Sequence, residues 1–244
     1  MATNPMHQFN VYRIGPEINL GGVDISFTNA SLFMMISAFT IISLFFLATK
    51  KKAIIPTKMQ LVSELCYSFV YKMISDTVGS KGKPYFPFIF SLFIFVLFSN
   101  MVGMLPYSFT VTSHIIVTFV LAAVVFVGVT IIGFVKHGIK YLELFVPKGV
   151  PIVLLPLIII IEIISYLSRP VSLSVRLFAN MMAGHTMLKV FGGFVISLGL
   201  LGGWLPLGFS VALTGLEILV AFLQAYVFAI LTCIYLNDAL NLHH

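Results

Sequence analysis

Long uninterrupted runs of apolar residues, separated by short polar connections, dominate the sequence. An α-helix of about 20 residues spans the roughly 30 Å hydrocarbon core of a bilayer, and five of the runs reach that length. The pattern therefore predicts an all-α integral membrane protein with about five membrane-embedded helices. The predicted helices cover approximately residues 28–49, 85–105, 113–136, 149–200 and 208–238.

A sixth segment, residues 57–78, has a different pattern. Val62, Leu65 and Phe69 recur at helical spacing on one side, whereas polar residues such as Gln60 occupy the other side. An amphipathic helix of this kind suits the membrane interface better than the hydrocarbon core. We therefore predict one interfacial helix in addition to the membrane-embedded ones.

The run at residues 149–200 is much longer than one membrane span needs. As one continuous helix it would be about 78 Å long, more than twice the thickness of a bilayer. Pro170 interrupts it as a helix breaker. Hydropathy is compatible with two spans joined by a sharp turn at Arg169-Pro170, and also with one steeply tilted helix that bends there.

The composition also indicates a bilayer environment. Hydrophobic residues make up 59% of the chain and charged residues only 9%, with a mean hydropathy of +1.08. Soluble proteins carry roughly 25% charged residues. The formal net charge of +6 comes largely from lysines at the ends of the apolar runs, so it does not indicate a nucleic-acid partner.

The lysines predict how the chain is oriented in the membrane. Of the 14 lysines and arginines, seven lie from Lys50 to Lys83 and three more from Lys136 to Lys148. Such loops stay on the cytoplasmic or matrix side, which places the N-terminus outside and the C-terminus inside. The predicted organisation is an irregular outer tail at 1–27, a single membrane domain at 28–240 and a short inner tail at 241–244.

Several kinds of chemistry find no support in the sequence. Cys66 and Cys233 lie far apart and form no CxxC motif, so neither a disulfide framework nor a metal site is indicated. There is no GxxxxGK[ST] phosphate loop, so the sequence gives no sign of a nucleotide site of this kind. We expect no cofactor and no catalysis by this chain alone.

The last two apolar runs contain ionisable side chains at membrane depth. Glu162, Arg169 and Arg176 are spaced by seven residues and so share one face of a helix, and His185 and Glu217 follow along the chain. A central arginine costs from about 3 to more than 10 kcal/mol in hydrocarbon, so such groups persist only with partners or with water. These residues are therefore candidates for an ion pathway.

A structural role is the alternative for each of these residues. Arg176 and Glu217 could form an ion pair that only holds two helices together. His185 could be a satisfied polar residue of the core. We expect Arg169 and Lys189 to snorkel or to cap helix ends rather than to conduct.

Two longer motifs resemble a known family. The run SRPVSLSVRLFANMMAGH at 168–185 resembles the signature of subunit a of F-type ATP synthases, and LEILVAFLQAYVFAILTCIYLNDA at 216–239 resembles the final helix of that family. The segments LFSNMVGMLPY and PYSFTVTSH are similar to it as well. The resemblance covers about residues 85–240 and is to the mitochondrial and alphaproteobacterial type.

The resemblance implies a fold and a position facing a partner. Residues 149–200 would form one long, bent, nearly horizontal helix, paired in a hairpin with 208–238 against a ring of c subunits. Arg176 matches the essential cation that faces this c-ring, and Asn180 and Gln224 match its polar neighbours.

The resemblance also implies a function, which is proton translocation by the stator of a rotary ATP synthase. His185 and Glu217 match residues of an outer half-channel, and Glu162 matches an acid of an inner half-channel. The implied partners are the c-ring, b-type peripheral stalk subunits, the remaining ATP synthase subunits, the lipid bilayer and H⁺. The implied location is a bacterial plasma membrane or a mitochondrial inner membrane.

Two other functional classes are compatible with a polytopic membrane protein. A secondary transporter would be expected to contain repeated halves with helices broken at matching positions, and no internal repeat is evident. A non-conducting scaffold would leave the charges around Arg176 without an explanation.

Overall fold

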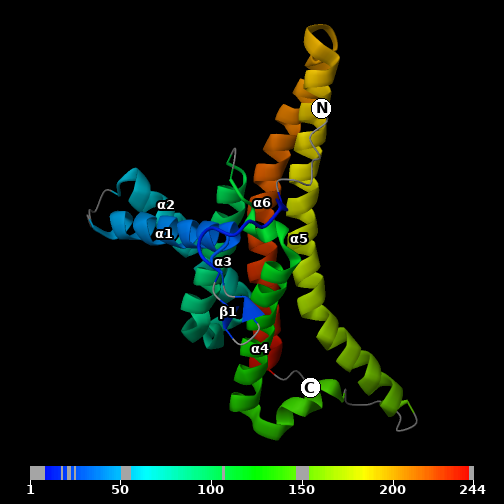
Figure 1. Ribbon diagram of the computed structural model, residues 1–244. Coiled ribbons are helices and arrows are strands. Elements are labelled where there is room, and N and C mark those ends of the chain that lie inside the picture. Colours follow the sequence, from blue (N-terminus) through cyan, green and yellow to red (C-terminus); the bar gives the residue numbers. More distant parts are fainter. Residues whose placement is uncertain are drawn as a thin grey trace. The chain divides into compact units, whose positions relative to one another are not determined.

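Figure 1 shows a computed structural model of the chain, in which helices make up nearly all of the described structure. The described residues are 9–17, 19–20, 23–24, 26–50, 56–105, 108–146 and 154–241. The α-helices are α1 Asn29–Lys50, α2 Lys58–Thr77, α3 Phe86–Gly103, α4 Ile115–His137, α5 Leu155–Gly202 and α6 Trp204–Leu240. Three 3-10 helices connect them, η2 Gly79–Tyr85, η3 Val111–Ser113 and η4 Gly138–Phe145.

The prediction of an all-α membrane fold is confirmed. Among the described residues, five helical stretches have the length and the apolar composition needed to cross a bilayer. They are Asn29–Lys50, Gly79–Gly103, Ile115–Leu142, Leu155–Gly199 and Trp204–Leu240. The interfacial position of α2 and the tilt of α5 and α6 stay predictions.

The N-terminal tail differs from the irregular segment that was predicted. Strands β1 Asn19–Leu20 and β2 Val23–Asp24 pair as a short antiparallel hairpin. Thr28 Oγ1 accepts a hydrogen bond from the backbone N–H of Ser31, which satisfies a free donor in the first turn of α1. Parts of several predicted segments lie outside the described residues, namely residues 1–8, 18, 21–22, 25, 51–55, 106–107, 147–153 and 242–244.

The chain divides into two units by its internal contacts, and α3, α5 and α6 each contribute to both. The first unit comprises Met1–Ser63, Ile94–His114 and Leu177–Ala225. The second unit comprises Glu64–Phe93, Ile115–Arg176 and Tyr226–His244. The predicted single membrane domain stays a prediction.

In the first unit, α5 and α6 form an antiparallel hairpin (Figure 1). The ring of Phe191 stacks on that of Phe209 with 5.8 Å between their centroids. Deeper in the hairpin, Asn180 of α5 donates a hydrogen bond to Gln224 of α6 over 2.8 Å. Both contacts fit one antiparallel register. The position of the turn therefore determines approximately which residue of α6 faces a given residue of α5.

Two glycines shape the connection between α5 and α6. Gly199 adopts φ +61° and ψ −159°, a conformation that side-chain-bearing residues rarely adopt. The N–H of Gly203 donates to the carbonyl of Gly199 over 2.9 Å, and a Cβ on Gly203 would lie 2.6 Å from that oxygen. This close backbone approach lets α6 begin at Trp204, earlier than the predicted start at residue 208.

The second unit is organised around aromatic and hydroxyl side chains of α4, η4 and α5. Tyr141 of η4 is 1% exposed and packs directly on the backbone of α4 at Gly133, where a Cβ would overlap its ring. Its hydroxyl lies 3.0 Å from that of Tyr166 on α5, which lies 2.7 Å from Thr130 Oγ1 on α4. A side-chain network therefore ties three elements together.

Helix α5 continues through Pro170, so the alternative of two spans with a sharp turn at Arg169-Pro170 is wrong. A proline removes one backbone hydrogen bond but can be accommodated inside a long membrane helix whose neighbours support it. The non-helical backbone angles within α5 are at Gly199 instead, near its end.

Candidate functional site

A buried acid and a histidine face each other across the α5–α6 hairpin of the first unit. Glu217 on α6 is only 4% exposed, and its Oε1 lies 3.4 Å from Nδ1 of His185 on α5. Neither carboxylate oxygen makes a hydrogen bond with a described residue. A carboxylate in apolar surroundings is costly, so this pair can hold a proton that moves between the acid and the imidazole.

A hydroxyl from the segment after α3 supports the imidazole from its other side. Thr110 Oγ1 lies 2.9 Å from His185 Nε2 and donates to the carbonyl of Gly103 over 3.1 Å. Because the hydroxyl hydrogen is used on the carbonyl, the oxygen accepts from Nε2–H. This network assigns the Nε2–H tautomer, and Nδ1 is left to exchange a proton with Glu217.

His114 lies four residues after Thr110 in the same segment, just before α4. Its ring stacks on that of Phe109 with 4.8 Å between centroids. Burial lowers the pKa of His114, because desolvation disfavours the charged imidazolium. His114 is therefore neutral near pH 7, and it adds no positive charge to its surroundings.

Polar side chains continue along the hairpin next to the acid. Gln224 is 3% exposed and accepts the hydrogen bond from Asn180 already described. Asn100 of α3 is fully buried, donates to the carbonyl of Ala221 over 3.2 Å and accepts from Thr112 over 2.8 Å. The small side chain of Ala221 leaves room for Asn100 to reach the α6 backbone. Buried amide and hydroxyl groups therefore lie among the apolar side chains of this region.

Three other charged residues of α5, namely Glu162, Arg176 and Lys189, have no such partners among the described residues of their units. Arg176 on α5 is exposed and makes no hydrogen bond or ion pair with a described residue of its unit. Glu162 is half-buried and also unpaired among the described residues of that unit. Lys189 is exposed one turn beyond His185, and no interaction of it with a described residue of its unit is seen.

Arg169 was expected to snorkel or to cap a helix end, and the structure gives it partners that this expectation did not include. Its Nη1 donates to Oδ2 of Asp238 over 3.0 Å, and its guanidinium lies over the rings of Tyr166 and Tyr235. The pairing has a simple cause, because α6 returns antiparallel to α5 and brings Asp238 opposite Arg169. The sequence motifs did not single out Asp238.

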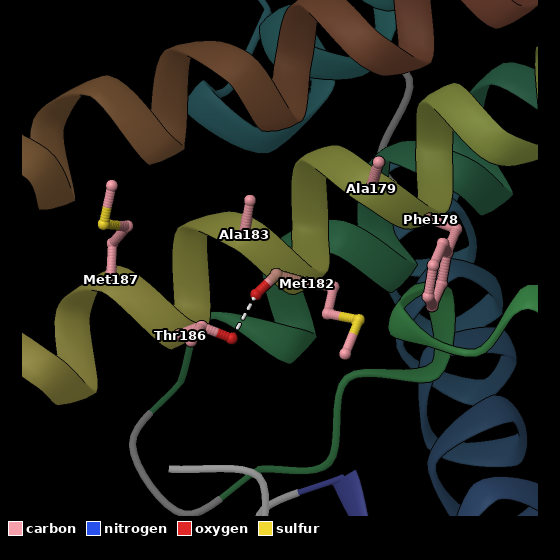
Figure 2. A pocket seen from close by; sticks show the side chains of 6 residues that line it. All are labelled: Phe178, Ala179, Met182, Ala183, Thr186 and Met187. Atoms are coloured by element: carbon pink, nitrogen blue, oxygen red, sulfur yellow. Dashed lines mark hydrogen bonds between the residues drawn. The ribbon is translucent and has the colours of Figure 1, made fainter.

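A shallow apolar hollow lies on α5 in the first unit (Figure 2). Figure 2 shows Ala179, Ala183 and Met187 pointing to one side of the helix, with Ala179 and Ala183 one turn apart. Thr186, its one polar residue, donates its hydroxyl hydrogen to the carbonyl of Met182 over 2.7 Å. The hollow therefore offers small apolar side chains to a neighbour. It is lined by Phe178, Ala179, Met182, Ala183, Thr186 and Met187.

The structure thus brings some of the sequence-derived candidates together. His185 meets Glu217, and Asn180 meets Gln224, as hairpin pairs. Thr110 was missed because its role depends on a segment 75 residues away in sequence from His185. Among the described residues, no group of three His, Cys, Asp or Glu side chains is arranged to hold a metal ion.

Comparison with known proteins identifies the family of the chain. Residues 31–237 match the family described as ATP synthase A chain. The chain is 80% identical to ATP synthase subunit a of Pelagibacter ubique (strain HTCC1062) over 244 residues, which is the full length of both. It is 58% identical to ATP synthase subunit a of Chelativorans sp. (strain BNC1), again over both full lengths, and 58% identical to that of Rhizobium rhizogenes (strain K84 / ATCC BAA-868) over 99% of this chain and 98% of the relative. The chain therefore belongs to the ATP synthase A chain family and is a membrane-embedded component of the ATP synthase.

Proposed function

We propose that this chain is the proton-translocating stator subunit of a rotary F-type ATP synthase. It provides two offset half-channels that load and unload carboxylates on a rotating ring of c subunits. The observation that carries the proposal is the buried Glu217 carboxylate, 4% exposed and unbonded among the described residues, with His185 at 3.4 Å. A structural acid in this setting would be expected to have its oxygens satisfied.

Protons enter from the outer side through the pair of His185 and Glu217. Thr110 holds the imidazole so that Nδ1 faces the acid, and one proton passes between the two groups. From Glu217 the proton reaches an ionised carboxylate of the ring. That carboxylate becomes neutral and can then face lipid, which a charged one cannot do cheaply.

Arg176 separates the two half-channels. A guanidinium keeps its proton at any physiological pH, and that of Arg176 makes no hydrogen bond or ion pair with a described residue of its unit. It attracts each arriving carboxylate, favours its ionised form and bars protons from passing directly between the half-channels. Asn180 stands one turn further along α5 and, with Gln224, serves as a polar neighbour of this cation.

Release takes place on the inner side near Glu162, after nearly a full turn of the ring. Glu162 lies two heptads before Arg176 on the same helix face, so it stands on the opposite side of the cation from His185. The driving force is about 2.3 kcal/mol per charge per 100 mV of membrane potential, together with the pH gradient.

The hollow of Figure 2 supports contact with the ring. Small residues allow the backbones of membrane helices to approach closely, and Ala179 and Ala183 lie one and two turns beyond Arg176 on α5. We expect a helix of the ring to pack there. The b-type peripheral stalk would hold the chain still while the ring turns.

The lysine distribution supports an orientation with the N-terminus outside and the C-terminus inside. The named relatives come from bacteria, and we propose a bacterial plasma membrane as the location. The chain carries no nucleotide chemistry in this scheme and acts as conduit and stator.

The test is ATP synthesis driven by an imposed pH gradient, in vesicles that hold the whole complex. Glu217→Gln should lower the rate by about tenfold or more, because a positioned proton carrier is lost. Asp76→Asn is the matched control, since it removes an exposed carboxyl from α2 and should leave the rate near wild type. Normal synthesis by an assembled Glu217→Gln complex would refute the assignment of the outer path.

A further inference from the structure

Arg169 is held by several groups of the second unit. It forms an ion pair with Asp238, and the two side chains are 24% and 32% exposed. The guanidinium carbon lies 5.4 Å from the ring centroid of Tyr166 and 5.0 Å from that of Tyr235, both within the range of a cation–π contact. The charge is therefore balanced by one carboxylate and shielded by two aromatic faces.

The tyrosine under this guanidinium is itself fixed. The Tyr166 hydroxyl lies 2.7 Å from Thr130 Oγ1 and 3.0 Å from the hydroxyl of Tyr141. The rings of Phe126 and Phe145 pack on it with centroid distances of 4.9 and 5.4 Å. A residue with all these contacts offers a rigid surface, so Arg169 has little freedom to swing away from Asp238.

The two arginines of this face of α5 therefore differ in their availability. Arg169 and Arg176 are seven residues apart, about 10 Å along the helix axis, and Glu162 lies seven residues before Arg169. Arg169 is paired, whereas Arg176 makes no ion pair with a described residue of the second unit. Sequence alone gives no reason why the guanidinium of Arg169 forms an ion pair and that of Arg176 forms none within the described residues of this unit.

We propose that Asp238 is a positioning residue that withholds Arg169 from the mobile carboxylates, so that Arg176 alone receives them. This inference rests on the proposed function. A second free guanidinium about 10 Å away would attract an ionised carboxylate of the ring or pair with Glu162. Either contact would hold a carboxylate ionised at the wrong place and slow each step of the ring.

The experiment is a charge series in the whole complex, reconstituted in vesicles and normalised to the amount assembled on native gels. The variants are Asp238→Asn, Asp238→Glu, Arg169→Gln and the double variant Arg169→Gln/Asp238→Asn. ATP-driven proton pumping by Asp238→Asn should fall about fivefold or more, which corresponds to about 1 kcal/mol in the limiting step. Asp238→Glu should retain most of the rate.

The double variant separates charge withholding from simple bracing. If Asp238 acts by occupying Arg169, removing both charges should restore pumping to within about twofold of wild type, a difference below 0.5 kcal/mol. If the pair only braces two helices, the double variant should pump as poorly as Asp238→Asn. That result, or a normal rate in Asp238→Asn, overturns the inference.

Two single variants, Arg169→Gln from this series and Arg176→Ala in addition, keep the test decisive. If Asp238→Asn does not assemble, Arg169→Gln decides, because it removes the competing cation and should pump near the wild-type rate, and a strong loss overturns the inference. Arg176→Ala in the same series tests the proposed function separately. Normal pumping by Arg176→Ala refutes that function, whereas loss there with normal pumping by Asp238→Asn refutes only the role of Asp238.

Discussion

The surroundings of Glu217 depend on a neighbour that has no side chain. A Cβ placed on Gly184 would lie 2.8 Å from Oε1 of Glu217 and 3.2 Å from its carboxyl carbon. The acid thus occupies the space that a side chain at 184 would fill. The sequence motif contains this glycine, but only the fold of the hairpin reveals what the space is for.

We predict that Gly184→Ala lowers proton pumping several-fold while the complex still assembles, because the added methyl displaces the carboxyl group from His185. The matched control is Gly192→Ala on the same helix, where a Cβ meets no atom within 4 Å. ATP-driven acidification of vesicles measures both variants. Equal rates for the two alanine variants would contradict the packing argument.

Thr110 is the other uncharged residue that sets the geometry of the pair. Its hydroxyl accepts from His185 Nε2–H, so its loss leaves the imidazole free to change tautomer or rotate. We predict that Thr110→Val lowers pumping about fivefold, the effect of one lost hydrogen bond of about 1 kcal/mol. Thr110→Ser keeps the hydroxyl and should stay close to wild type. A serine variant as impaired as the valine variant would exclude the hydroxyl as the cause.

At the scale of elements, the apolar runs predicted the helices well. The predicted range 113–136 compares with Ile115–His137, and 208–238 compares with Trp204–Leu240. Runs of this length have one stable solution in a bilayer, because each backbone group must be satisfied within its own helix. The predicted connection between α5 and α6 was too long, because it ran from residue 200 to residue 208, whereas α5 ends at Gly202 and α6 begins at Trp204. The short connection depends on the close backbone approach at Gly203.

Contacts between elements could not be predicted in the same way. Arg169 was expected to snorkel or to cap a helix end. Its pairing with Asp238 was not predicted, because it joins positions 69 residues apart. Likewise Tyr141 falls within the basic loop predicted from Lys136 to Lys148, but it is buried against α4. Hydropathy does not indicate which polar groups come into contact when helices pack. A resemblance to a family motif indicates such contacts only for the residues within the motif.

The contact between η4 and α4 gives a prediction about stability. In Gly133→Ala the new methyl would overlap the buried ring of Tyr141, and overpacking of this kind costs about 1–3 kcal/mol. We expect the midpoint of thermal dissociation of the detergent-purified complex to fall by about 2 °C or more. Gly128→Ala on the same helix meets no atom within 4 Å and should leave the midpoint unchanged. A Gly133→Ala complex as stable as the Gly128→Ala control would show that the ring can move aside.

At the scale of the whole molecule, family membership and membrane embedding are established, and the coupling of proton flow to rotation is the proposal. A transporter that works alone would conduct without a c-ring, and a scaffold would not conduct at all. Within the part of the chain that the structure describes, Glu217 has no hydrogen bond and Arg176 has no ion pair in its own unit. A scaffold does not need charged groups in such a state. Both rivals therefore differ from the proposal in what happens when Arg176 is removed from an assembled complex.

The most direct measurement is ATP-driven proton pumping in vesicles that hold the whole complex, comparing wild type with Arg176→Ala. If the chain is the proton-translocating stator, pumping is lost in fully assembled Arg176→Ala complexes. Passive proton leak rises as well, because the fixed cation no longer separates the two half-channels. Pumping at the wild-type rate would contradict the account and favour a scaffold.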